Sequence, residues 1–243
     1  ILNTNGEETV TSLTATGTIN GEGTVSALTY DLNGATANAN LGTGALTSNG
    51  DTALNGSSAA DTVTVVGGTL TVDGALNNNT ASINVEAGTL AANGTVAASS
   101  INVQGGANLT TGEAERLNDG VALNADGTVS LGGNETIGDL SGGATGTIAN
   151  NGNDLTVTQT SDQGFSGNIT GAGGLAKQGE ANLTLGSGSD FTGDANINEG
   201  TLTVSGNLAT NTINVANGAT LTTTAAELLS DGATLTADGT VNL

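Results

Sequence analysis

The chain has 243 residues, with 23 acidic side chains against two basic ones, a net charge of −21, and no His, Cys, Pro, Met or Trp. Nucleic-acid binding needs Lys and Arg to displace counterions, while zinc, haem, iron–sulfur and disulfide sites need His or Cys, so these classes are excluded. No apolar run reaches the roughly 18 residues of a membrane-spanning helix. Because the chain contains no Met, we expect it to be a processed product or a piece of a longer protein.

Short segments that alternate apolar and polar residues recur along the chain, and this period of two predicts strands with one buried face. They include VTV at 63–65, INV at 83–85 and 101–103, LTL at 183–185 and INV at 213–215. Asn-Gly and Asp-Gly dipeptides separate many of them, as at Asn33-Gly34 and Asp73-Gly74, and these residues favour turns and tolerate positive φ. The exception is TTGEAERLNDG (110–120), for which we expect one helical turn.

The sequence repeats at two periods. GTLTVDGAL from Gly68 returns 20 residues later as GTLAANGTV and again as GTLTVSGNL from Gly200. Residues 84–131 also align without a gap to 196–243, and 26 of the 48 positions are identical, which a biased composition alone would not produce.

A short repeated strand unit fits either a meander of hairpins or a coil whose circuits stack in parallel, a β-solenoid. The solenoid is favoured because equivalent residues recur one period apart and because three aromatic residues are too few for a sandwich core. We therefore expect one all-β solenoid over residues 1–243, with about 12 rungs of ~20 residues and a length of roughly 58 Å. The predicted inward-facing core comprises Val63, Val65, Leu70, Val72, Ile83, Val85, Leu90, Ile101, Val103, Leu109, Leu175, Leu183, Leu185, Leu202, Val204, Ile213, Val215 and Leu221.

One segment, residues 164–204, resembles the passenger-associated transport repeat of bacterial autotransporters. The matching elements are Phe165-x-Gly167, the run from Gly171 through Leu175 to Lys177-x-Gly179, Leu183-x-Leu185, Phe191-Thr-Gly, and Gly200-Thr-Leu. The resemblance implies a right-handed parallel β-helix, extracellular and displayed on the bacterial surface, followed by an outer-membrane barrel beyond this segment. Since no His is present for a Ser–His–Asp set, we expect a non-enzymatic role in adhesion, biofilm matrix, or surface-layer and fibre formation.

The expected partners are a host or neighbouring cell surface, matrix, or other copies joined end to end or laterally, and not nucleic acid. With one Arg and one Lys, the chain offers trypsin-like proteases two sites, which is compatible with an extracellular life. The alternatives are a β-helical enzyme scaffold acting on polysaccharide and an ice-binding solenoid. Stacked Thr-Leu-Thr triplets at Thr69–Thr71, Thr201–Thr203, Thr220–Thr222 and Thr234–Thr236 suggest the latter.

Few residues qualify as chemical sites. Glu113 and Glu115 beside Arg116 are candidates for an acid–base pair, but only Glu115 has a counterpart in the duplication, at Glu227, so a solvated loop is favoured. Asp126 and Asp238 lie in Asp-Gly-Thr turns. The Gly-rich run at 171–179 lacks the Gly-Lys-Ser/Thr of a phosphate loop. We predict no catalytic residue, cofactor or metal ligand, with structural calcium near NNGNDLTV (150–157) as the one ion left open.

Overall fold

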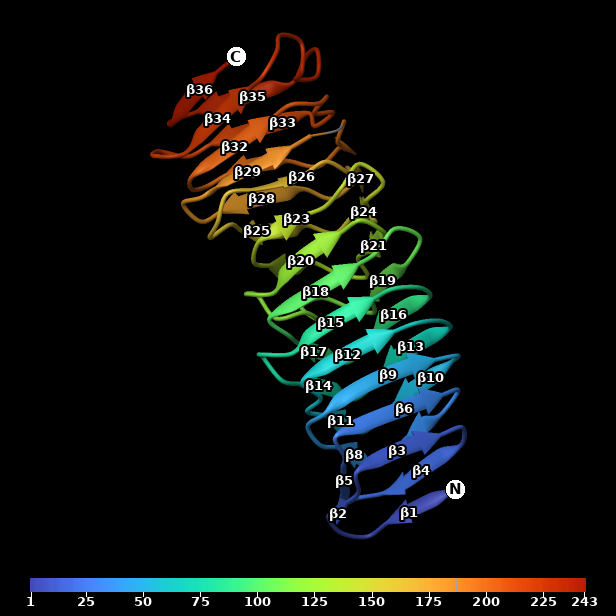
Figure 1. Ribbon diagram of the computed structural model, residues 1–243. Coiled ribbons are helices and arrows are strands. Elements are labelled where there is room, and N and C mark those ends of the chain that lie inside the picture. Colours follow the sequence, from blue (N-terminus) through green and yellow to red (C-terminus); the bar gives the residue numbers. More distant parts are fainter. Residues whose placement is uncertain (187) are drawn as a thin grey trace.

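A computed structural model of the chain describes residues 1–186 and 188–243. Ser187, within the transport-repeat-like segment, lies outside the described residues. The described residues form 36 strands and no helix, and every strand pair is parallel. Successive circuits stack into a rod of about 13 turns with the two ends of the chain at opposite ends (Figure 1). The prediction of a parallel β-solenoid is confirmed.

Three sheets form the faces of the N-terminal part. Sheet A comprises β1 (Leu2–Thr4), β4 (Thr18–Gly21), β7 (Thr36–Ala37), β10 (Thr52–Leu54), β13 (Thr69–Val72), β16 (Thr89–Ala92), β19 (Asn108–Thr111), β21 (Thr128–Ser130), β24 (Thr147–Ala149), β27 (Asn168–Gly171) and β30 (Asp190–Phe191). Sheet B comprises β2 (Glu8–Thr9), β5 (Thr24–Ser26), β8 (Asn40–Leu41), β11 (Ser57–Ser58), β14 (Ala75–Asn77) and β17 (Thr95–Ala97). Sheet C comprises β3 (Ser12–Ala15), β6 (Thr29–Asn33), β9 (Ala45–Asn49), β12 (Thr62–Val65), β15 (Ser82–Val85), β18 (Ser100–Val103), β20 (Ala122–Ala125) and β23 (Leu140–Ser141).

Two further sheets accompany sheet A toward the C-terminus. Sheet D comprises β22 (Glu135–Ile137), β25 (Leu155–Thr158), β28 (Leu175–Gln178), β31 (Ala195–Ile197), β33 (Thr212–Val215) and β35 (Thr234–Ala237). Sheet E comprises β26 (Gln163–Phe165), β29 (Asn182–Leu185), β32 (Thr201–Val204), β34 (Thr220–Thr223) and β36 (Thr240–Asn242).

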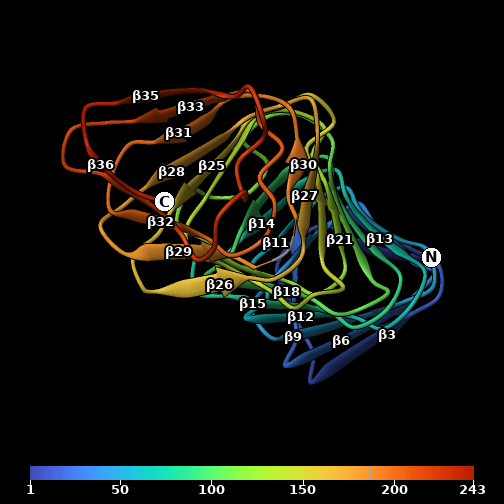
Figure 2. The same ribbon diagram turned by 90° about the horizontal axis from the view of Figure 1, so that it is seen from above.

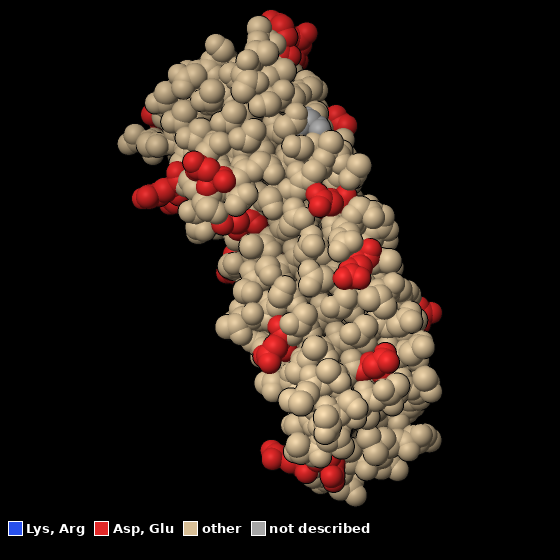
Figure 3. All heavy atoms as spheres, in the orientation of Figure 1, with Lys and Arg blue, Asp and Glu red and all other residues tan. Residues whose placement is uncertain are grey.

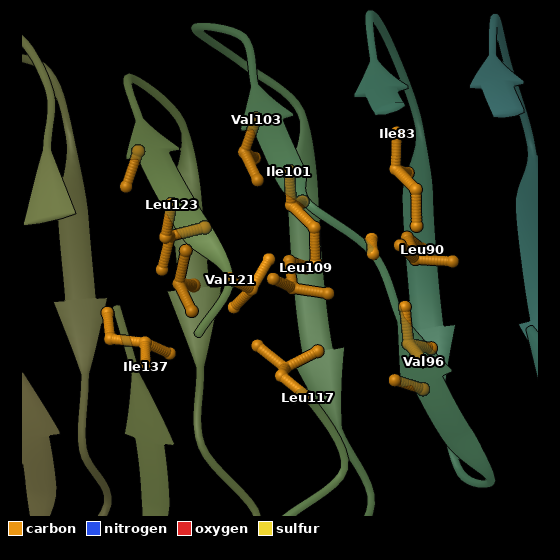
Figure 4. Close-up of a cluster of buried hydrophobic side chains, with 14 of the residues drawn as sticks. Ile83, Leu90, Val96, Ile101, Val103, Leu109, Leu117, Val121, Leu123 and Ile137 are labelled. Carbon is orange, nitrogen blue, oxygen red and sulfur yellow. The ribbon is translucent and has the colours of Figure 1, made fainter. Parts of the chain in front are cut away.

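Aliphatic side chains stack in columns inside the rod. Ile83 pairs with Ile101, which pairs with Leu123, and on sheet A Leu90 pairs with Leu109 (Figure 4). Every core residue predicted from the alternation is buried, with at most 2% of its surface exposed. Each rung therefore contributes a few aliphatic groups to one continuous apolar column, which removes their surface from water.

The turn length varies more than the repeats predict. Tyr30 pairs with Leu46, 16 residues on, whereas Ile101 pairs with Leu123, 22 residues on. The strands keep their register because the extra residues lie in the corners between sheets, where loops tolerate insertions.

Glycines at the corners serve two different purposes. Gly34 has a φ of 65°, as expected for an Asn-Gly turn. Gly74 is not among the residues with positive φ, although Asp73-Gly74 reads as the same kind of turn. A Cβ on Gly74 would lie 2.2 Å from the carbonyl oxygen of Gly56, one turn below. Close approach of stacked backbones, rather than positive φ, therefore explains this glycine.

Among the described residues, sheet A alone continues past the level at which sheets B and C end. Sheet B ends near Leu117, which forms an isolated bridge to Val96, and sheet D begins at β22. Sheet C ends at β23, where Gly142 bridges to Phe165 and sheet E begins. Figure 2 shows that the turns carrying sheets D and E lie to one side of the N-terminal turns. We call this boundary, residues 115–117 and 134–142, the sheet joint.

The sequence duplication crosses the sheet joint. Residues 100–103 lie on sheet C, whereas their counterparts 212–215 lie on sheet D, and 108–111 lie on sheet A whereas 220–223 lie on sheet E. The duplicated unit therefore keeps its local strand–turn–strand structure but occupies different faces of the solenoid.

The expected helical turn at 110–120 is absent, and this prediction is wrong. Glu115 has a φ of 51°, and its counterpart Glu227 one of 60°, so neither segment continues a right-handed helix. The N–H groups of Arg116 and Leu117 donate to the carboxylate of Glu135 in the next turn instead of to a preceding carbonyl.

Candidate functional site

The sheet joint is held by a buried carboxylate. Glu135 starts β22 in phase with the inward-facing Ile137, and only 1% of its surface is exposed. Its two oxygens accept hydrogen bonds from the N–H groups of Leu117 at 2.9 Å and Arg116 at 3.2 Å. At this boundary the side chain therefore replaces the backbone acceptors that a continuous sheet would supply.

Burial raises the pKa of the Glu135 carboxyl from 4.5 to about 7, even though the two N–H donors lower it. The nearby Glu115 carboxylate raises it further, and Arg116 opposes that effect. This carboxyl is the strongest titrating feature of the joint, but its burial behind two backbone donors suits a structural role better than general acid catalysis.

A second buried charge lies in the transport-repeat-like segment. Lys177, in β28, alternates in phase with Leu175 and is fully buried. Its Nζ donates to the carbonyl oxygens of Gln178, Gly179 and Glu199 at 2.9, 2.7 and 3.0 Å. Burial lowers the pKa of this ammonium, against the opposing carboxylates of Glu199 and Asp162. All three N–H groups of the ammonium are therefore used in hydrogen bonds that join one corner of two successive turns.

The other residues of this segment also have structural partners. A Cβ on Gly142, Gly146 or Gly167 would lie 3.0, 3.1 or 2.5 Å from the buried ring of Phe165. Asn150 is fully buried and its amide pairs with both the N–H and the carbonyl of Gly173, at 3.0 and 2.8 Å. The Phe-x-Gly and Gly-x-Gly-Gly elements therefore describe where one turn packs on the next.

The structure separates the acid–base candidates. Glu113 forms an ion pair with Arg116, and Glu115 accepts from the Thr136 hydroxyl at 3.1 Å, so these carboxylates point to different partners. Asp126 accepts from the N–H of Gly143 at 2.6 Å, which is a contact between turns that turn chemistry alone does not predict. Asp238, its counterpart in the duplication, is exposed.

The segment proposed for calcium uses its oxygens within the fold. Asn150 Oδ1 accepts from the N–H groups of Gly152 and Gly173, and Asp154 Oδ1 accepts from that of Gly174 at 2.8 Å. Within residues 1–186 and 188–243, no three His, Cys, Asp or Glu side chains group closely enough to hold a metal ion. Structural calcium remains a prediction.

Acidic residues lie mainly in the turns, and the sheet faces are nearly uncharged. Across the described residues, the strands hold only Glu8, Asp31, Glu135 and Asp190. Figure 3 shows the carboxylates of one side as small separate groups along the rod. The outward row of sheet A from Thr18 to Thr170 contains only Thr, Ser and Ala.

The four Thr-Leu-Thr triplets do not share one face. Thr69–Thr71 lies on sheet A, Thr201–Thr203 and Thr220–Thr222 lie on sheet E, and Thr234–Thr236 lies on sheet D. In the first three the Leu is buried, whereas Leu235 is 38% exposed. The triplets therefore form no continuous flat array of the kind that the ice-binding alternative needs.

Several hollows interrupt the described surface, including two at corners between sheets. One, of about 590 Å³, is open and mostly apolar, beside the exposed Val10 and Leu28. The other, of about 380 Å³, lies at the corner that leads into sheet D. We call it the Gly174 slot and define it by Asp154, Thr156, Gly174, Ala176, Asp194 and Asn196.

Sequence reasoning missed Glu135 and the inward position of Lys177. The signal was present in both cases, because each charged residue occupies the buried phase of an alternating strand, two residues from Ile137 or Leu175. The slot left no such signal, because it depends on which side chains stacking brings together.

No family model, curated protein or solved structure matches the chain. In the part of the chain that the structure describes, no helix is long and apolar enough to cross a membrane.

Proposed function

We propose that the chain is a non-enzymatic rod of an autotransporter-type passenger, displayed outside the cell, which projects or adheres to surfaces. The proposal rests mainly on the contacts of the transport-repeat-like residues, whose functional groups bind other parts of the fold. Lys177 binds three carbonyls and Phe165 fills a space between glycines, so the most distinctive residues support the stacking of turns.

Two features of the surface support an extracellular rod. Of the two trypsin-type sites, Lys177 is fully buried and Arg116 is partly shielded, with 22% of its side chain exposed. The carboxylates at the turns repel like-charged rods, whereas the neutral sheet faces remain available to a cell surface, to matrix or to a second copy.

Cell-surface display tests the proposal. The chain is fused to an outer-membrane β-barrel, and adhesion to matrix-coated surfaces and cell–cell aggregation are compared with those of the barrel alone. We expect the displayed rod to increase at least one of them. Cells that display intact rod, as verified by antibody labelling, but behave like the barrel control on every surface would contradict the proposal.

A further inference from the structure

The Gly174 slot lies along one turn whose outward residues are small, between two turns whose outward residues are larger. Thr156, Ala176 and Asn196 are in register on neighbouring strands of sheet D, and Ala176 projects only a methyl group between the hydroxyl and the amide. At the adjoining corner, the buried Gly174 lies between the turns that carry Asp154 and Asp194. The surface over these residues is hollowed to a volume of about 380 Å³, within the size range of small-molecule sites.

The walls of the slot present both acceptors and donors. Asp154 is fixed by the hydrogen bond that its Oδ1 accepts from the N–H of Gly174, and it keeps a second oxygen for a ligand. Asp194 on the opposite wall is exposed. Asn196 accepts from Asn214 at 2.8 Å through its Oδ1, so its amide nitrogen remains a donor.

The groups that line the slot indicate the kind of ligand. Asp154 and Asp194 are two turns apart, which places their backbones ~9.6 Å from each other at ~4.8 Å per turn. Calcium takes six to eight oxygen ligands, and among the described residues no three His, Cys, Asp or Glu side chains group closely enough to hold a metal ion, so two carboxylates alone do not make a cation site. A six-membered sugar ring carries hydroxyl donors on opposite sides and can reach both walls, with each hydroxyl ~2.7 Å from its acceptor.

We propose that the Gly174 slot binds one pyranose unit of a neutral glycan. Ring hydroxyls donate to Asp154 and Asp194, and Asn196 donates to a ring or hydroxyl oxygen. Anionic sugars are disfavoured by the two carboxylates and by the net charge of −21. Because no aromatic side chain lines the slot, we expect dissociation constants in the millimolar range. The inference rests on the proposed function for its biological meaning, since a glycan is what a surface rod would contact.

The isolated chain allows the slot to be tested apart from the surface role. The amide resonances of Gly173, Gly174 and Ala176 are followed by NMR while methyl glycosides of glucose, galactose and mannose are added. We expect saturable shifts at these amides for at least one glycoside. Ala176→Gln fills the slot from an outward position and should abolish the shifts. Ala91→Gln, at an equally outward position of sheet A, is the matched control and should leave them unchanged.

Asp194→Asn gives a second test that does not depend on added volume, because it removes a charged acceptor from an exposed site. Affinity should fall about tenfold, as expected for a hydrogen bond to a charged group. Calcium chloride is added separately as a cation control. The proposal is overturned if no glycoside shifts the slot amides, if Ala176→Gln leaves the shifts intact, or if calcium alone shifts them. If the isolated chain binds a glycoside but the displayed rod does not increase adhesion or aggregation, the result would instead count against the proposed function.

Discussion

At the residue scale, the buried charges show how polar groups maintain a rod made mostly of small side chains. Glu135 supplies acceptors where two sheets end, and Lys177 supplies donors where two turns meet. Each compensates for its own burial by completing the hydrogen bonding of buried backbone groups.

The raised pKa of Glu135 predicts a pH-dependent stability. A carboxyl whose pKa rises from 4.5 to about 7 on folding stabilises the fold below pH 4.5, and that contribution is lost as the pH rises toward 7. The loss amounts to about 3 kcal/mol. Glu135→Gln does not titrate, so we expect its free energy of unfolding in urea to gain about 3 kcal/mol relative to the unsubstituted protein between pH 4 and pH 8. If the difference in free energy of unfolding between the two proteins stays constant from pH 4 to pH 8, burial does not raise the pKa of this carboxyl.

Lys177→Met should destabilise the protein by at least about 2 kcal/mol, because three carbonyl oxygens lose their donor while the apolar stem is conserved. Gln178→Met, at the neighbouring half-buried outward position, is the control and should cost less than about 1 kcal/mol. Equal costs in urea unfolding would contradict the role given to the ammonium.

At the element scale, each strand has a buried and an outward face, and the prediction of facing is testable in β32. Leu202→Ala should cost about 2–5 kcal/mol, since Leu202 is 1% exposed between Leu183 and Leu221. Thr203→Ala, on the outward face, should cost less than about 1 kcal/mol. Denaturant unfolding of both variants measures the difference, and similar losses would mean that the facing is misassigned.

The glycine stacks at the corners predict a second contrast. Gly74→Ala places a methyl group against the Gly56 carbonyl and should destabilise by about 1–3 kcal/mol. Gly17→Ala meets nothing within 4 Å and should be neutral or slightly stabilising. Thermal unfolding distinguishes the two, and a tolerated Gly74→Ala would argue against close stacking at that corner.

The strands could be predicted from the sequence because burial follows a period of two at residues such as Val63 and Val65. Their assignment to faces could not, because each face depends on the summed length of the preceding turns, and residues paired on successive turns lie 16 to 23 positions apart. The sheet joint and the displacement of 212–215 to sheet D follow from that sum. The Gly174 slot was unpredictable for the same reason, since Asp154 and Asp194 lie near each other only because their turns stack in this order.

At the scale of the whole molecule, charged and neutral side chains occupy different parts of the rod. The turns carry most of the carboxylates, and the sheets present neutral rows of Thr, Ser, Ala and Asn. The rod therefore combines long-range repulsion with uncharged surfaces for contact, which suits projection from a surface.

Distances along one outward row of sheet A test the stacked-turn architecture most directly. The chain has no native Cys, so paired Cys substitutions can carry spin labels at Thr36 with Thr110, Ser130 or Thr170, which lie four, five and seven turns apart in the strand register. At ~4.8 Å per turn the labelled backbones lie about 19, 24 and 34 Å apart, and pulsed electron paramagnetic resonance should give label-to-label distances near these values that rise in step with turn number. Separations that fail to rise in that order, as in a folded-back hairpin sandwich, would contradict the solenoid and the functions argued from it.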